Sequence, residues 1–170
     1  MDDKKIIITG TNNRYQIKKA TEKRAPPKKR AEVEKWSLEE DYYTAEKQLS
    51  LLNQDPIYPL LVQQIERKIQ GYKQQDLDKA LFDTNKFIQF EDVVQFLLDA
   101  RLGCYYCKKN MLLLYKNVRE GCQWTLDRIN NDLGHNTDNV FVSCLECNLK
   151  RRRCNADKFL FTKQMVIVRL

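Results

Sequence analysis

The sequence contains no long hydrophobic run, no secretory leader pattern and a single histidine. No apolar stretch approaches the roughly 18 residues that a membrane-spanning helix requires. The first residues, from Asp2 to Lys5, are charged and lack the apolar core of a signal peptide. We therefore expect no membrane association and a location inside the cell, in a reducing compartment. No internal repeat is visible, which argues against a solenoid.

Six cysteines are present, and four of them form two Cys-x-x-Cys doublets: Cys104 with Cys107, and Cys144 with Cys147. Without a secretory context, doublets at this spacing favour a metal site over disulfides. Two tight turns can place four thiolates around one zinc ion in a closed tetrahedral site, which predicts a structural metal. The alternatives are an iron-sulfur cluster, or a redox doublet beside an unrelated pair. Cys122 and Cys154 are interpreted as free thiols.

The formal charge of +7 is distributed unevenly along the chain. Residues 1–35 carry a net charge of +6, residues 36–103 carry −5, and residues 104–154 carry +4. Basic ends around an acidic middle suit a polyanion that binds the tail and the cysteine-bounded region. The acidic middle is expected to face something else, and a protein partner docked on 36–103 is one hypothesis. The oligomeric state is left open.

The length of 170 residues suits one modest compact unit with a tail. Residues 1–35 are poor in apolar side chains and are predicted to be a disordered basic arm. The arm contains the basic cluster at 26–30, which resembles a nuclear import signal and could equally contact phosphates or aid solubility. Residues 36–103 are predicted to be helical, and 104–170 are assigned to a zinc-bound domain.

Capping signals and apolar periodicity predict the helices within 36–103. Ser37 opens a Ser-x-x-Glu capping box, and Pro59 is well placed at the first position of a helix. Apolar side chains from Phe90 onward recur at helical spacing, with Gly103 available as the terminator. The helices predicted in this way cover 38–53, 59–71, 75–82 and 90–101.

The pattern changes from helical to β beyond the first cysteine doublet. Residues 123–129 and 139–143 are predicted to form a hairpin, joined by a loop rich in turn-forming residues. Residues 111–115 are predicted as an edge strand, and 145–153 as a helix. The second doublet then lies where the last strand meets that helix. The predicted fold class is α+β.

The residues between and just after the doublets resemble a known family. The resemblance rests on Leu126-Asp127-Arg128-Ile129-Asn130-Asn131, Gly134-His135, Asp138-Asn139-Val140, Cys144-Leu145-Glu146-Cys147-Asn148 and Arg151. In this order they are similar to the HNH endonuclease family with its ββα-metal fold, in the zinc-bound four-cysteine form of phage and large DNA viruses. The resemblance covers 104–153 and implies a Mg²⁺- or Mn²⁺-dependent DNA endonuclease. No base-reading element is apparent, so little sequence specificity is expected.

Physical chemistry suggests roles for these residues that agree with the resemblance. Cutting a phosphodiester needs a divalent cation on the scissile phosphate. The carboxylate of Asp127 and the amide oxygen of Asn148 are hard ligands of the kind that Mg²⁺ prefers. The zinc would hold helix against hairpin and so set the distance between these ligands. Asn139 is expected to hydrogen-bond across the hairpin and hold the loop in shape.

Cations after the second doublet are predicted to contact nucleic-acid phosphates. Arg151 lies one helical turn after Asn148 and is expected to hold the phosphate. Its basic neighbours, which would extend that surface, are Lys150, Arg152 and Arg153. Taken singly, Asp127 could instead be a turn acid paired with its neighbour, and the basic run could be a solvated helix face.

The sequence departs from the family pattern at the general base. The usual motif places a histidine after the acid, whereas Arg128 follows Asp127 here. Arginine stays protonated, so it is a poor base, although it is a good phosphate clamp. His135 in the loop could accept the proton, or could be a polar loop residue. A second hypothesis is a non-catalytic DNA-binding protein or a structural or packaging protein of a virion. For either function, a host nucleus or a virion is a candidate location.

Overall fold

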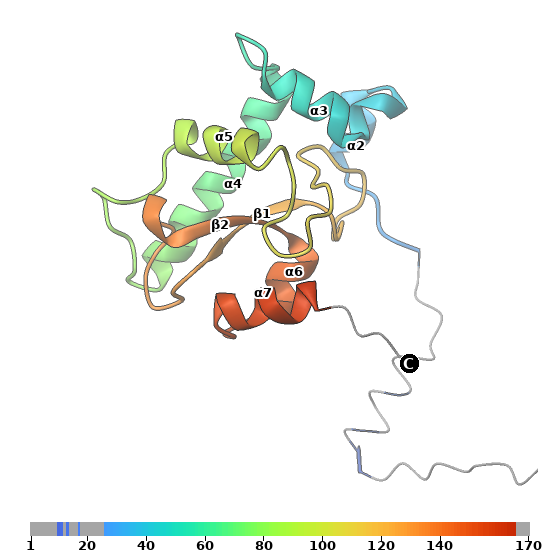
Figure 1. The fold of residues 1–170 in the computed structure, drawn as a ribbon. Coiled ribbons are helices and arrows are strands. Elements are labelled where there is room, and N and C mark those ends of the chain that lie inside the picture. Colours follow the sequence, from blue (N-terminus) through green and yellow to red (C-terminus); the bar gives the residue numbers. More distant parts are fainter. Residues whose placement is uncertain (1–9, 12, 14–16, 18–25, 166–170) are drawn as a thin grey trace, which may run out of the picture.

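The computed structural model describes residues 10, 11, 13, 17 and 26–165 (Figure 1). Most of the predicted arm over 1–25 therefore lies outside the described residues. The elements are α2 (Glu32–Trp36), the 3₁₀ turn η1 (Glu40–Tyr43), α3 (Ala45–Leu52), α4 (Pro59–Asp78), α5 (Phe90–Asp99), β1 (Trp124–Arg128), the 3₁₀ turn η2 (Thr137–Asn139), β2 (Val140–Cys144), α6 (Leu145–Arg151) and α7 (Ala156–Gln164). The fold class is α+β, as predicted. Within the described residues, no helix is both long and apolar enough to cross a bilayer.

Strands β1 and β2 form the predicted antiparallel hairpin, and α6 follows β2 directly. A two-stranded hairpin is marginally stable alone. Here side chains bind the outer edge of β1: the hydroxyl of Tyr72 on α4 accepts the N–H of Leu126 at 3.0 Å, and Asn148 donates to the Leu126 carbonyl at 3.3 Å. Lys68 on α4 donates to the carbonyl of Trp124. Helices α4 and α6 thus take the place of a third strand.

The edge strand predicted over 111–115 is absent from the described structure. Residue Leu112 forms one isolated bridge with Gln123 and no ladder. The buried side chain of Gln48 accounts for this, because its Oε1 accepts the N–H of Leu113 at 2.7 Å and its Nε2 donates to the Leu114 carbonyl at 2.8 Å. Backbone groups that a neighbouring strand would have bound are satisfied by one amide side chain.

The helix expected over 38–53 begins later than its capping signal indicated. Ser37 has a left-handed φ of 45° after α2, and its hydroxyl donates back to the Glu34 carbonyl. A 3₁₀ turn follows, and Thr44 caps α3 by accepting the N–H of Lys47 at 3.3 Å. The Ser-x-x-Glu pattern at Ser37 was therefore the wrong helix start.

Helix α4 continues through Gly71, where a helix end was expected, and includes part of the weaker stretch at 75–82. A helical glycine costs only about 1 kcal/mol relative to alanine. The buried side chains of Ile69 and Tyr72 on either side contribute more than that to the core. Helix α5 ends at Asp99, a few residues before Gly103.

One hydrophobic core joins the helical segment to the cysteine-bounded region. It contains Ile65 of α4, Leu97 of α5, Trp124 of β1 and Phe159 of α7. Figure 1 shows the hairpin between α4 and α5 on one side and α6 and α7 on the other. Helix α7, which the sequence pattern did not predict, begins at Ala156 and is capped by Asn155, whose side chain accepts the N–H groups of Asp157 and Lys158.

Residues 28–30, which we expected in the disordered arm, pair with residues near the hairpin. The N–H of Arg30 donates to the Lys116 carbonyl at 2.8 Å, and the Lys28 carbonyl accepts from Val118 at 2.9 Å. The Arg30 guanidinium lies over the ring of Tyr115 at 4.4 Å and donates to Gln64 at 2.9 Å. These contacts attach the end of the arm to α4.

Candidate active site and metal cluster

The four doublet cysteines meet in one cluster. Their sulfur atoms all lie within 4.8 Å of one another, and Cys107 Sγ is 3.9 Å from Cys144 Sγ. A tetrahedral zinc site with zinc–sulfur bonds of about 2.3 Å requires sulfur separations near 3.8 Å, which this arrangement fits. Cys122 and Cys154 remain outside the cluster as free thiols. The structure therefore shows a four-cysteine group that could bind a metal such as zinc.

The cluster joins three elements of the fold. Cys144 ends β2 and precedes α6, and its N–H donates to Cys104 Sγ at 3.3 Å. The hydrogen bond between the Cys104 and Cys144 side chains lowers the pKa of Cys104 and raises the pKa of Cys144. Tyr105 donates its N–H to Val142 and stacks on Phe141 with ring centroids 3.8 Å apart. The first doublet is thereby held against β2.

Asp127 on β1 is 4% exposed and is held by three hydrogen bonds. The Tyr106 hydroxyl donates to Oδ2 at 2.7 Å. Arg151 binds both oxygens, from Nε to Oδ2 at 2.6 Å and from Nη2 to Oδ1 at 2.8 Å. Tyr106 belongs to the first cysteine doublet, and Phe159 supports its ring edge-on at 5.0 Å. The doublet therefore contributes a side chain to the site as well as two sulfur atoms.

Arg151 does not lie where the sequence led us to expect it. It is 1% exposed, and besides Asp127 it donates to the carbonyls of Cys154, at 2.7 Å, and Arg128. A buried carboxylate is costly without a paired cation, and Arg151 meets that requirement. It is consequently not free to hold a phosphate. Its neighbours Lys150, Arg152 and Arg153 are exposed; Lys150 pairs with Glu146 one turn away.

Two asparagines orient the hairpin and its loop. The Nδ2 of Asn148 donates to Thr125 Oγ1 at 3.1 Å and to the Leu126 carbonyl, which leaves its amide oxygen unoccupied by these bonds. Asn139 accepts the Asn130 N–H at 2.9 Å and donates to the carbonyls of Asn130 and Gly134. Asn139 thus binds across the loop as expected.

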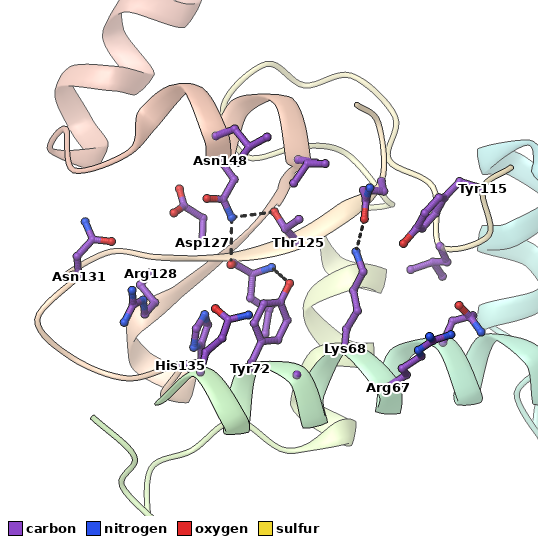
Figure 2. A pocket seen from close by; sticks show the side chains of 18 of the residues that line it. Arg67, Lys68, Tyr72, Tyr115, Thr125, Asp127, Arg128, Asn131, His135 and Asn148 are labelled. Atoms are coloured by element: carbon purple, nitrogen blue, oxygen red, sulfur yellow. Dashed lines mark hydrogen bonds between the residues drawn. The ribbon is translucent and has the colours of Figure 1, made fainter. Parts of the chain in front are cut away.

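A cavity of about 600 Å³ separates the hairpin from α4. Asp127, Asn148 and His135 all line it, as Figure 2 shows. Asp127 is the single acid among the lining residues. The basic side chains that line it are Arg30, Arg67, Lys68, Arg128 and Arg152. A concave surface with this excess of cations attracts polyanions.

Helix α4 supplies two of these cations, although the segment that contains it is acidic overall. Arg67 pairs with Glu32 of α2. Lys68 is partly buried: its ammonium lies 4.8 Å from the Trp124 ring centroid and donates to Gln123 Oε1 at 3.2 Å. Burial, helped by the nearby charge of Arg30, lowers the pKa of Lys68 to about 7. The sequence offered no signal that Arg67 and Lys68 line a cavity, because the run Glu66-Arg67-Lys68 is typical of a solvated helix face.

His135 is held rather than loosely exposed on the loop. It is 4% exposed, and its ring stacks on Tyr72 with centroids 4.5 Å apart. The carboxylate of Asp76 on α4 lies 2.8 Å from His135 Nδ1 and accepts the His135 backbone N–H at 2.6 Å. Arg128 donates to the Leu133 carbonyl at 3.1 Å and lies 4.0 Å from Asp76. Sequence reasoning missed Asp76, which stands in a charged stretch that resembles a helix surface.

Comparisons with known proteins give one partial relationship. The chain is 32% identical over 93 residues to an uncharacterized protein of Acanthamoeba polyphaga mimivirus. That match covers 55% of this chain and 15% of the viral protein. No family model and no solved structure matches. The comparisons therefore relate the chain to part of an uncharacterized viral protein.

Proposed function

We propose that the protein is a zinc-stabilised, Mg²⁺- or Mn²⁺-dependent endonuclease of the HNH type that hydrolyses DNA with little sequence specificity. One observation carries the proposal: Asp127, Asn148 and His135 line a single cavity together with five basic side chains. Phosphodiester hydrolysis needs oxygen ligands for a cation, a proton acceptor and positive charge for the phosphates. The cavity wall offers all three.

The oxygens on the cavity wall fit a hard divalent cation. Asn148 uses its Nδ2 within the protein, so its amide oxygen is available as a ligand. Oδ1 of Asp127 accepts one hydrogen bond, from Arg151, and keeps a further lone pair. When bound, the cation would neutralise charge that develops on the scissile phosphate. Arg151 and Tyr106 hold the Asp127 carboxylate in one orientation.

The cysteine cluster is proposed to bind zinc in a structural role. Four cysteines close the coordination sphere and leave no position for a substrate. The cluster lies where β2 meets α6. Asn148 belongs to α6, and Asp127 on β1 pairs with Phe141 of β2. Zinc at this junction would therefore fix the distance between the two proposed ligands.

DNA is proposed to bind across the basic side of the cavity. Arg128 lies at the hairpin end, and Arg67 and Lys68 lie along α4 (Figure 2). Arg152, which follows α6, also lines the cavity. Contacts of this kind would be with phosphates, which carry no sequence information. Salt-sensitive binding without base preference is expected. A protein partner on 36–103 stays a prediction.

A second function has one observation in its favour. The bidentate contact with Arg151 neutralises the Asp127 carboxylate, which weakens its attraction for a cation. A protein with this arrangement could bind DNA, or package it in a virion, without cutting. Binding would then be salt-sensitive and unaffected by chelation of Mg²⁺.

Nicking of supercoiled plasmid with Mg²⁺ or Mn²⁺ tests the proposal. Asp127→Asn preserves the shape of the side chain, and we expect it to lower the nicking rate about 100-fold or more, because a misplaced cation loses several kcal/mol of transition-state stabilisation. Asp132→Asn, an exposed acid on the loop that follows β1, is the matched control and should cut as wild type does. Zinc content is measured for each protein. Wild type that cuts no faster than Asp127→Asn with zinc retained would contradict the nuclease and favour the second function.

A further inference from the structure

A buried carboxylate from α4 contacts the only histidine of the chain. Asp76 is 0% exposed, and His135 supplies both its ring Nδ1 and its backbone N–H to the two carboxylate oxygens. A buried carboxylate is costly unless its partners offset the lost hydration. Asp76 lies 59 residues before His135 and outside the segment that resembles a nuclease.

The contact selects one form of the imidazole. A carboxylate only accepts hydrogen bonds, so Nδ1 of His135 carries the proton that it donates to Asp76. In the neutral ring the lone pair is then on Nε2. Stacking on Tyr72 restricts rotation of the ring. Since His135 lines the cavity, an oriented proton acceptor adjoins the space shared with Asp127 and Asn148.

The loop backbone is built to bring His135 against α4. A Cβ at Gly134 would lie 2.5 Å from the Leu81 carbonyl oxygen and 2.9 Å from Asp76 Oδ2, so only glycine allows this approach. On the other side, the His135 carbonyl accepts the N–H of Ile88 at 3.0 Å. The histidine is therefore fixed from two directions, which a solvated loop residue would not require.

Burial favours the neutral imidazole of His135. Burial is the largest influence and lowers the pKa of His135 below its ordinary value. The cations of Arg128 and Lys79 act in the same direction, and Asp76 opposes them. Tyr72 packs on the ring face. A base has to be unprotonated before the reaction, and this environment supplies that form near neutral pH.

We propose that Asp76 is a positioning residue that orients His135 as the general base of the nuclease; the inference rests on the proposed function. Nε2 takes a proton from the attacking water as the water oxygen bonds to phosphorus. The bond from phosphorus to the leaving sugar oxygen breaks, and that oxygen takes a proton from solvent. Asp76 stabilises the imidazolium, which returns its proton to solvent. The histidine that the family pattern places after Asp127 is replaced by one from the loop.

The tautomer is measurable without any cleavage. The chain has a single histidine, so ¹⁵N-histidine labelling gives NMR signals from one imidazole. We expect Nδ1 protonated and Nε2 unprotonated at pH 7.5 in wild type and in Asp78→Asn, an exposed control on the same helix. Asp76→Asn should lose that preference. An Nε2-protonated ring in wild type overturns the proposal, whether or not the protein cuts DNA.

Nicking rates test the chemical role. His135→Gln should cut about 100-fold or more slowly, the usual contribution of a general base, and Asp76→Asn about 10-fold or more slowly, because the tautomer is wrong. Free imidazole should restore cutting by the His135→Ala variant. It should restore cutting less in the double variant that combines His135→Ala with Asp76→Asn. Asp78→Asn should cut normally.

The outcomes separate the two proposals. If wild type and His135→Gln cut equally well, His135 is not the general base, but the nuclease proposal still holds. A folded Asp76→Asn with lowered stability and unchanged nicking overturns the positioning role. Wild type that fails to nick with either metal overturns both proposals.

Discussion

Two buried aspartates support the two walls of the cavity: Asp127 lines the hairpin wall, and Asp76 lies behind His135 on the α4 wall. They have different partners. Asp127 on the hairpin wall binds a permanent cation, Arg151, through both oxygens. Asp76 on the α4 wall binds a titratable ring, His135. Arginine stays charged, so its ion pair holds the carboxylate in place. Histidine can gain or lose a proton, so a carboxylate beside it affects the orientation and protonation of the imidazole. The same residue type thus forms a fixed ion pair on one wall and contacts a titratable ring on the other.

The walls also differ in how they are held together. The hairpin wall depends on the cysteine cluster, on Asn139 across the loop and on the contact between Tyr106 and Asp127. The α4 wall depends on the hydrophobic core and on polar side chains, such as Tyr72, that reach β1. Variants that disrupt one wall at a time should separate metal-dependent from core-dependent stability.

Loss of one cluster cysteine should have the largest effect on the hairpin wall. We expect Cys104→Ser to lose its metal and to unfold at a much lower temperature, because structural zinc contributes on the order of 10 kcal/mol in small metal-dependent domains. Metal stoichiometry and thermal unfolding followed by circular dichroism measure this. Cys154→Ser, an exposed thiol outside the cluster, should match wild type. A Cys104→Ser protein with full metal content and an unchanged melting temperature would show that the cluster is not a metal site.

Disruption of the ion pair should have the next largest effect. Arg151→Met leaves the Asp127 carboxylate buried without its cation, which we expect to lower the free energy of unfolding by about 3–5 kcal/mol. Asp76→Asn, on the opposite side of the cavity, should lower the free energy of unfolding by about 1–3 kcal/mol, because Asp76 is held mainly by hydrogen bonds from His135.

Urea unfolding at neutral pH measures both changes. Arg153→Met removes an exposed arginine from the same basic run and should change the free energy of unfolding by less than about 0.5 kcal/mol. If Arg151→Met were as mild as Arg153→Met, the pair with Asp127 would not hold the hairpin wall together. If Asp76→Asn were the costlier variant, the comparison between the walls would be reversed.

Substitution of Lys68 on α4 should change how the free energy of unfolding depends on pH, with a smaller effect than the substitutions above. The folded pKa of Lys68 is about 7, below its ordinary value near 10.4. Between these values the unfolded chain binds a proton that the folded chain does not, so the contribution of Lys68 to stability rises with pH and is least favourable below pH 7.

Lys68→Met should remove this slope, which is at most about 1.4 kcal/mol per pH unit. Urea unfolding from pH 7 to 9 measures the slope. Lys73→Met, an exposed lysine on the same helix, should keep the slope of wild type. Equal slopes in Lys68→Met and wild type would show that the Lys68 amine is not buried as described.

Much of the hairpin wall was predictable because its determinants are close together in the chain. Two residues separate the cysteines of each doublet, and β1, the loop and β2 follow one another. Asn139 binds atoms only five to nine residues away, so its role followed from the pattern. Local signals failed where a distant side chain competed, as when Gln48 replaced the strand expected over 111–115.

The α4 wall was not predictable from the pattern. Arg67, Lys68 and Asp76 are charged residues of a helix, and such residues usually face solvent. Nothing in their spacing distinguishes these three residues from Asp78, which is exposed. Only the packing of α4 against β1 brings the charged face of the helix to the hairpin.

The sequence by itself determined the four clustered cysteines, the hairpin and the residues that line its end, since each depends on short separations along the chain. Only the tertiary structure decided that Arg151 binds Asp127, 24 residues away, rather than facing solvent, and that Asp76 binds His135, 59 residues away. A buried charge takes whichever partner the packing brings within reach, because leaving it unpaired is costly. Pairing over such distances is a property of the assembled core.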